Sequence, residues 1–156
     1  MSVSVVPRRI FESLINHLIK IEDERLNVVD RYYPEWNDGR RSFQELLDSY
    51  ISRMEKIIYN ELKVDDSTSA VCPYVLIGSK LELENIHTAL KEEIQIVSPF
   101  TGIIDFEVAS ASYLSPMGRA FLLRKVNDTV SVETPMGVMQ YRINAIKPPD
   151  DIPQFY

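Results

Sequence analysis

The 156-residue chain is poor in the residues that build disulfides, metal sites and phosphate loops. Its single cysteine, Cys72, excludes an internal disulfide and favours a reducing, cytoplasmic compartment. The two histidines, His17 and His87, share no zinc-type spacing with that cysteine. The sequence also lacks a glycine-rich phosphate loop and a nucleophile motif. We therefore expect no zinc site and no phosphate-loop cofactor, while a Ser-His-Asp triad stays open at this point.

Long apolar runs and excess positive charge are missing as well. No run approaches the roughly 20 apolar residues of a membrane helix, and the apolar N-terminal stretch is too short for a signal peptide. The formal net charge is −6. Non-specific nucleic-acid binding depends on lysine and arginine releasing counterions from phosphates. We therefore expect neither a membrane partner nor binding to free DNA.

Residues 1–63 predict two helices joined by a turn. Pro7 suits the start of the first helix, and Pro34 ends it within a turn-rich segment. Either Ser42 and Glu45, which have the spacing of a capping box, begin the second helix, or this helix begins a little earlier. The two helices should pack antiparallel, with arms of about 35 Å. The expected apolar seams are Ile10, Leu14, His17 and Ile21 in the first helix, and Phe43, Leu47, Tyr50, Met54 and Ile57 in the second.

The pattern changes after a polar linker at 64–72. Residues 73–148 alternate as short strands, and 149–156 reads as an extended tail. Ser115 is a suitable N-cap for one short helix, from Pro116 to about Leu123. The fold class is therefore α+β: a helical hairpin and a mostly antiparallel sheet with one helix. The predicted strands are Tyr74–Ile77, Lys80–Glu84, Glu92–Val97, Asp105–Ser110, Thr129–Glu133 and Val138–Ile146.

One stretch of the C-terminal half resembles a known family. The run from Leu114 to Asp128 begins Leu-Ser-Pro-Met-Gly-Arg-Ala and ends in an Asn-Asp turn, and 130–137 continues as Val-Ser-Val-Glu-Thr-Pro-Met-Gly. With Ile77-Gly78-Ser79, these segments are similar to the C-terminal domain of the transcription elongation factors GreA and GreB. The resemblance implies that 73–148 is an FKBP-like domain that docks on RNA polymerase.

The same resemblance implies a function for the hairpin. Gre factors insert a coiled coil through the secondary channel of bacterial RNA polymerase. Acidic residues at its tip help to hold the second Mg²⁺ of the polymerase, which then hydrolyses backtracked RNA. Carboxylates are suitable ligands because Mg²⁺ prefers oxygen. The chain would thus complete the polymerase active site, share its Mg²⁺ and meet the 3′ end of the nascent RNA only indirectly.

Matching the second helix to the family places tip residues on this chain. Asp30 falls at the first acidic position and Tyr33 at the second, which is a departure from the family pattern. Glu35 and Asp38 lie nearby and could substitute. The expected catalytic-assisting acids are therefore Asp30, Glu35 and Asp38, with Asp30 and Glu35 as the metal pair. The expected RNA-contacting residues are Arg40 and Arg41.

The resemblance also implies a docking surface for the polymerase at the rim of the secondary channel. Leu114 stands where the family often has an aspartate, while the following Ser-Pro pair is retained. The expected docking residues are Leu114, Ser115, Pro116, Met117 and Arg119.

Three functions stay open at this stage. The first is a Gre-type elongation factor that stimulates RNA cleavage. The second is a non-cleaving regulator of the same channel that competes with Gre factors, since the hairpin is shorter than usual by roughly a dozen residues, or about 10 Å of reach. A remote third is an FKBP-like prolyl isomerase. The aromatic residues Tyr32, Tyr33 and Trp36 at the tip predict either a contact surface or a plug for the end of the hairpin.

Overall fold

A computed structural model describes residues 3–68, 71–100 and 108–152, and the chain divides into two compact units. One unit comprises Met1–Cys72 with Asp151–Tyr156, and the other comprises Pro73–Asp150. The second unit is thus an insertion into the first along the sequence. Within the described ranges, no helix is long and apolar enough to cross a membrane.

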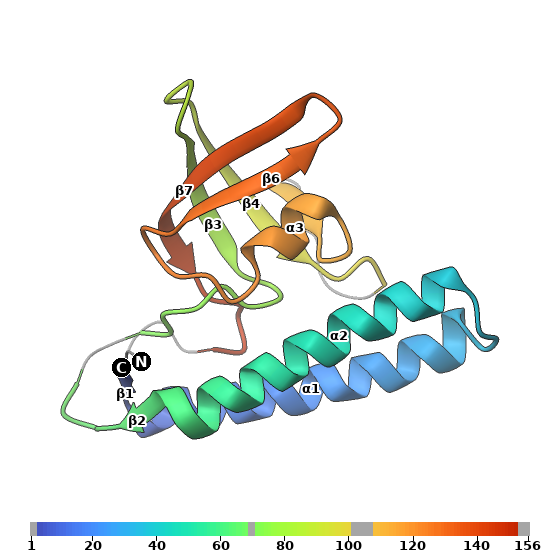
Figure 1. Cartoon of the computed structure of the whole chain (residues 1–156). Helices are drawn as coiled ribbons and strands as arrows, with labels where there is room; N and C mark the ends of the chain where they lie inside the picture. Colours follow the sequence, from blue (N-terminus) through green and yellow to red (C-terminus); the bar gives the residue numbers. More distant parts are fainter. Residues whose placement is uncertain (1–2, 69–70, 101–107, 153–156) are drawn as a thin grey trace. The chain divides into compact units, whose positions relative to one another are not determined.

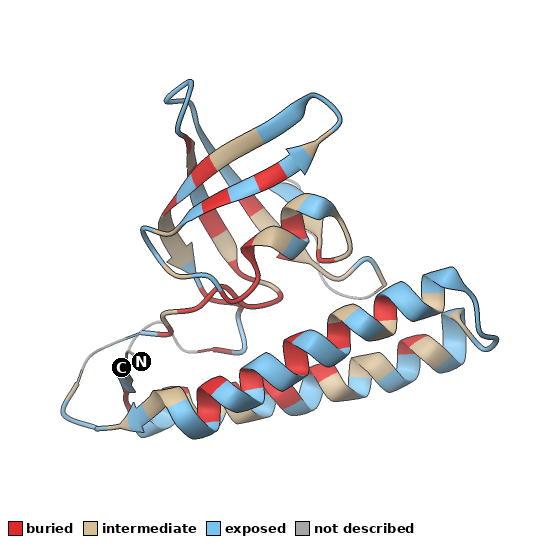
Figure 2. Ribbon diagram, in the orientation of Figure 1, coloured by how far each residue is buried: buried red, intermediate tan, exposed pale blue. Residues whose placement is uncertain are grey.

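The first unit is built on the expected hairpin. Helix α1 (Arg8–Tyr32) and helix α2 (Asp38–Lys56) run antiparallel, and α2 continues as a single π-helical stretch, η1 (Ile57–Glu61). All nine expected seam residues are buried. Figure 2 shows this buried stripe running along both helices, with the opposite faces exposed. The apolar spacing therefore identified the core of the hairpin.

The start of α2 differs from the sequence-based expectation. Asn37 caps the helix: its side-chain oxygen accepts a hydrogen bond from the backbone N of Arg40 at 2.8 Å. Ser42 and Glu45 lie inside α2, exposed to solvent, so the predicted capping box was wrong. Asn is among the strongest N-cap residues, and it lies five positions earlier, so the helix begins before the Ser-x-x-Glu pattern is reached.

A small sheet closes the base of the hairpin, and the sequence did not predict it. Strand β1 (Ser4–Val6) pairs in parallel with β2 (Leu62–Val64). Next to them, the carboxylate of Asp66 accepts a hydrogen bond from the backbone N of Arg8 at 2.8 Å. The first helical amide of α1 thus receives a cap from the linker that follows the hairpin.

The second unit is a five-stranded sheet in the order β5-β4-β3-β7-β6, seen in Figure 1. Only the β4–β5 pair is parallel; β3–β4, β3–β7 and β6–β7 are antiparallel. The short helix α3 (Pro116–Phe121) follows β5, and its Phe121 is fully buried against Tyr141. The strands are β3 (Lys80–Asn85), β4 (Lys91–Val97), β5 (Ala109–Ser112), β6 (Thr129–Thr134) and β7 (Gly137–Lys147).

Three predicted elements of this unit differ from the structure or lie partly outside the described residues. Tyr74–Ile77 is not a strand: Tyr74 forms only an isolated bridge with Lys125, although the segment is buried. The predicted strand Asp105–Ser110 lies partly outside the described residues, and β5 begins at Ala109. The helix after Ser115 also ends earlier than expected, before Leu123 with its positive φ of 63°.

Candidate functional site

The expected docking residues lie on a tightly bonded loop that leads into α3. The Ser115 hydroxyl donates to the carbonyl of Ser112 at 2.7 Å and accepts from the backbone N of Gly118 at 3.0 Å. The Ser112 hydroxyl in turn accepts from the backbone N of Leu114 at 3.0 Å. Pro116 occupies the first turn of α3, where its missing N–H leaves no acceptor unpaired. We call Ser112–Arg119 the docking loop.

Gly118 fixes the close approach within the docking loop. A Cβ atom there would lie 2.1 Å from the carbonyl oxygen of Ser112 and 2.8 Å from its carbon. No side chain fits at such distances, so the Ser-Pro-x-Gly pattern is a packing requirement. Within the loop, the side chain of Tyr113 is fully buried. This buried ring anchors the loop, whose outer residues face solvent.

The outer residues of the docking loop differ in exposure. Pro116 and Arg119 are exposed, whereas Leu114, Ser115 and Met117 are half-buried. All five are close together because they lie within one turn and one short helix. This surface combines an apolar part with one exposed cation.

The three acids of the hairpin tip come from three different local settings. Asp30 lies in the last turn of α1, Glu35 in the connecting loop, and Asp38 at the first position of α2, and all three are exposed. Asp38 forms an ion pair with Arg41, with 3.0 Å between its Oδ1 and the guanidinium. Across the described part of the chain, no three acidic, histidine or cysteine side chains gather as a metal site.

The two arginines predicted to contact RNA have different roles in the structure. Arg40 is half-buried and holds the loop: its guanidinium donates to the carbonyls of Tyr33 and Pro34, each at 3.4 Å, and to the side chain of Gln44 at 3.2 Å. Arg41 is exposed, and its guanidinium pairs with Asp38. The predicted contact of both arginines with RNA stays a prediction.

Of the three aromatic residues at the tip, one packs against the end of the hairpin core and two are exposed. Tyr33 is half-buried and packs against Phe43, with ring centroids 5.9 Å apart. Tyr32 is 46% exposed and Trp36 is 66% exposed. The question left open by the sequence therefore has two answers: Tyr33 closes the end of the hairpin, while Tyr32 and Trp36 face solvent.

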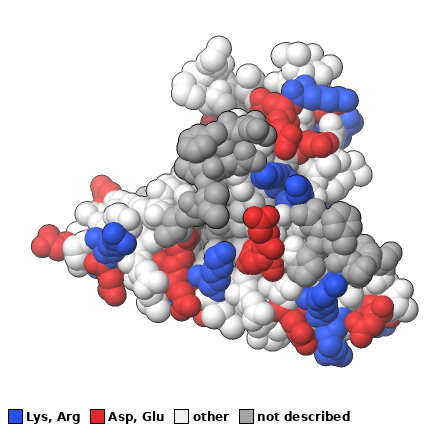
Figure 3. Space-filling view, turned by 180° about the vertical axis from the view of Figure 1, so that it is seen from behind, with Lys and Arg blue, Asp and Glu red and all other residues white. Residues whose placement is uncertain are grey.

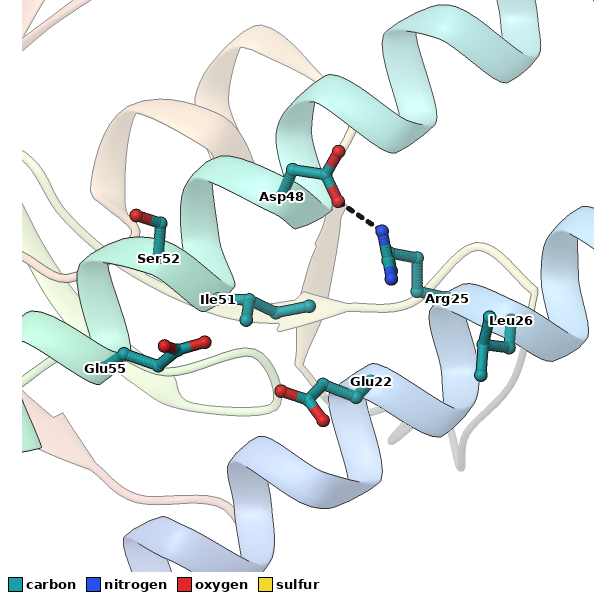
Figure 4. Close-up of a pocket in the computed structure, with 7 residues that line it drawn as sticks. All are labelled: Glu22, Arg25, Leu26, Asp48, Ile51, Ser52 and Glu55. Carbon is teal, nitrogen blue, oxygen red and sulfur yellow. Dashed lines mark hydrogen bonds and ion pairs between the residues drawn. The ribbon is translucent and has the colours of Figure 1, made fainter.

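A shallow groove of about 320 Å³ runs between α1 and α2, and no sequence pattern predicted it. In Figure 4, Glu22 from α1 and Glu55 from α2 extend toward it, and Arg25 bridges the helices to Asp48 at 2.6 Å. Leu26, Ile51 and Ser52 complete the lining.

Figure 3 shows acidic and basic side chains interspersed on the visible face, without a field of one sign.

Comparison with known proteins identifies the family. The model for the C-terminal domain of transcription elongation factors GreA and GreB matches residues 70–148, slightly more than half of the chain. The chain belongs to the GreA/GreB family. Its curated Gre relatives include the transcription elongation factor GreA of Thermotoga petrophila, 30% identical over 109 residues, which cover 70% of this chain and 67% of the relative. The resemblance seen in the sequence is thus confirmed.

The Gre-family relatives carry two kinds of name. The transcription inhibitor protein Gfh1 of Thermus aquaticus is 28% identical over 127 residues, covering 81% of this chain and 79% of that protein. Among solved structures, GreA/GreB from Nitrosomonas europaea aligns with a TM-score of 0.55 at 18% identity, covering 84% of this chain and 93% of that one. This likeness supports the α+β fold alone.

The family match includes one candidate site and leaves out the other. The docking loop lies inside residues 70–148, whereas the tip acids and arginines precede them. The docking loop therefore shares the family pattern directly. The tip must be judged from its own geometry.

Proposed function

We propose that this Gre-family chain binds bacterial RNA polymerase through the docking loop and inserts the hairpin tip into the secondary channel as a non-cleaving regulator. The family likeness implies both surfaces. Two features of the docking loop support this role: the hydrogen bonds of the Ser115 hydroxyl and the close contact of Gly118 with Ser112, which together fix the conformation of the loop. A pre-shaped surface loses little conformational entropy when a partner binds.

The ion pair between Asp38 and Arg41 carries the non-cleaving part of the proposal. It places a cation 3.0 Å from one of three candidate ligands, where it opposes a second positive charge. The expected length of the hairpin points the same way. Helix α1 has 25 residues, or about 37 Å, and from the match to the Gre pattern we expect arms shorter by roughly 10 Å of reach. Metal positioning tolerates errors of only about 0.5 Å.

Cleavage stimulation is the second candidate, and one observation favours it. Asp30 and Glu35 are exposed, and neither forms an ion pair within the described part of the chain. Their carboxylates would be available to a Mg²⁺ ion held by the polymerase. In that case too, the chain would act without catalysis of its own. No observation favours prolyl isomerase activity, because a shared fold does not carry a function.

A halted, backtracked elongation complex with end-labelled RNA decides between the two. We expect no RNA shortening by the wild-type chain, and a concentration-dependent loss of the cleavage stimulated by an authentic GreA. The variant Gly118→Ala, in which the docking loop is distorted, should no longer compete. Cleavage by the wild type that Asp30→Ala and Glu35→Ala abolish would establish the second candidate instead. A wild-type chain that fails to bind polymerase would refute both.

A further inference from the structure

Trp36 is the only tryptophan of the chain and lies at the hairpin tip with 66% of its surface exposed. The hairpin core does not require it, because Tyr33 and Phe43 already close that end. Its immediate neighbours Glu35 and Asn37 are polar and exposed. A large aromatic face is therefore presented alone, at the point of the hairpin farthest from its base.

Arg40 holds the ring of Trp36 in place. The guanidinium carbon lies 5.5 Å from the ring centroid, as in a cation–π contact. Arg40 is itself fixed by the carbonyls of Tyr33 and Pro34 and by the side chain of Gln44. The ring is thus supported from one side by a group that the loop immobilises, and it has less freedom to lose when a flat ligand stacks on it.

A second arginine–aromatic pair, Arg31 with Tyr32, also belongs to the tip segment. The guanidinium carbon of Arg31 lies 5.6 Å from the ring centroid of the half-exposed Tyr32. Aromatic rings paired with arginine are the side chains on which proteins stack unpaired bases. The local charge permits an approaching phosphate, although the whole chain is acidic, since three tip cations balance three tip anions: Arg31, Arg40 and Arg41 against Asp30, Glu35 and Asp38.

We propose that Trp36 is a stacking platform for an unpaired nucleotide of RNA. The inference rests on the proposed function, because the polymerase channel would bring extruded RNA to the tip. Tyr32, four residues before Trp36 and half-exposed, would offer a second ring at the tip. A protein partner fits the tip less well, because its exposed apolar surface is confined to isolated rings among charged residues, without an aliphatic patch around them.

The test compares binding to two polymerase complexes, one backtracked with extruded RNA and one not backtracked. Trp36→Leu keeps an apolar side chain but removes the aromatic face, and it should weaken binding to the backtracked complex by about 5- to 100-fold, the range for loss of one stacked base. Binding to the other complex should stay unchanged. Trp36→Phe keeps an aromatic face and should retain most of the wild-type affinity for the backtracked complex. Tyr59→Leu is the matched control, since Tyr59 is 73% exposed but lies outside the tip.

Two outcomes would overturn the stacking platform. Equal weakening on both complexes would show that Trp36 contacts polymerase protein, and no weakening on either would show that it contacts nothing. Failure of the wild type to bind either complex would instead refute the proposed function. Trp36 fluorescence would then decide the stacking question on the isolated chain. Quenching by short oligoadenylate beyond that of free N-acetyltryptophanamide supports stacking, and equal quenching refutes it.

Discussion

The carboxylate of Asp151 lies 3.2 Å from Nδ1 of His17, a residue only 2% exposed in the middle of α1. On its other side, Nε2 of His17 lies 3.0 Å from the hydroxyl of the buried Tyr50. The imidazole therefore joins α1 to α2 and to a segment 134 residues away in the sequence. Ile152, next to Asp151, is also buried. Several consequences of this arrangement can be measured.

Replacing Asp151 by Asn should lower the stability of the hairpin unit at pH 7 and make that stability less dependent on pH. The hydrogen bond from His17 holds the pKa of Asp151 below its ordinary value of 3.8, so the carboxylate stabilises the folded state above that pH and loses this effect as the pH falls through the lowered pKa. Since Asp151 is partly exposed, the effect at pH 7 should be at most about 1 kcal/mol, or about 2–4 °C in melting temperature.

Thermal unfolding followed by circular dichroism at pH 7 and at pH 2 measures this effect. The difference between Asp151→Asn and the wild type should shrink at the lower pH. Asp150→Asn is the matched control, because Asp150 is exposed and adjacent. Equal melting temperatures for the wild type and Asp151→Asn at pH 7 would argue against the contact.

Tyr50→Phe should destabilise the hairpin unit by about 1–3 kcal/mol. The change removes one hydroxyl and leaves Nε2 of the buried His17 without its partner, and an unpaired buried polar group is costly. Tyr59→Phe makes the same chemical change on a side chain that is 73% exposed, and it should shift stability by less than about 0.5 kcal/mol. Urea unfolding curves of both variants provide the comparison, and similar losses would contradict a special role for Tyr50.

Gly118→Ala should destabilise the sheet unit by at least about 2 kcal/mol, because its methyl group overlaps the backbone of Ser112. Gly137→Ala separates this steric effect from backbone strain: Gly137 has a φ of +113°, but a Cβ there would meet no atom within 4 Å. We expect a cost of only about 1 kcal/mol at Gly137. Denaturant unfolding measures both, and an equal cost would show that the contact with Ser112 relaxes freely.

Ser115→Ala should weaken polymerase binding by loosening the docking loop. The change removes the hydroxyl that caps α3 and bonds to Ser112, at a cost of about 1 kcal/mol in stability. Ser131→Ala, on the exposed face of β6, is the control and should leave both stability and binding near wild type. A pull-down titration with core polymerase measures the affinity. Unchanged binding by Ser115→Ala would place the docking surface elsewhere.

Helices and strands were predicted most accurately from the sequence where apolar residues recur with a regular period. The helical seam from Ile10 to Ile57 and the alternating strands β6 and β7 were found to within a residue or two, because side chains that recur on one face leave a statistical trace. Tyr74–Ile77 shows the limit of this reasoning. A short buried apolar segment resembles a strand even when it forms only a single bridge.

Contacts between distant segments left no such trace. The β1–β2 pair joins strands of only three residues each. Asp151 contacts His17 although the whole sheet unit separates the two residues in the sequence. At the tip, the acids and arginines could be placed by family likeness, but their pairing depends on loop geometry. Only the structure revealed that Asp38 engages Arg41 and that Arg40 supports Trp36. The roles predicted for these residues stay predictions.

The insertion of Pro73–Asp150 into the hairpin unit sets an order on biosynthesis. The ribosome makes both helices early, and they can pair as soon as α2 emerges. Asp151 and Ile152 are made only after the entire inserted unit. Nδ1 of His17 therefore lacks its carboxylate partner until Asp151 has been made. A nascent chain stalled before that point would contain two paired helices without the contact between His17 and Asp151.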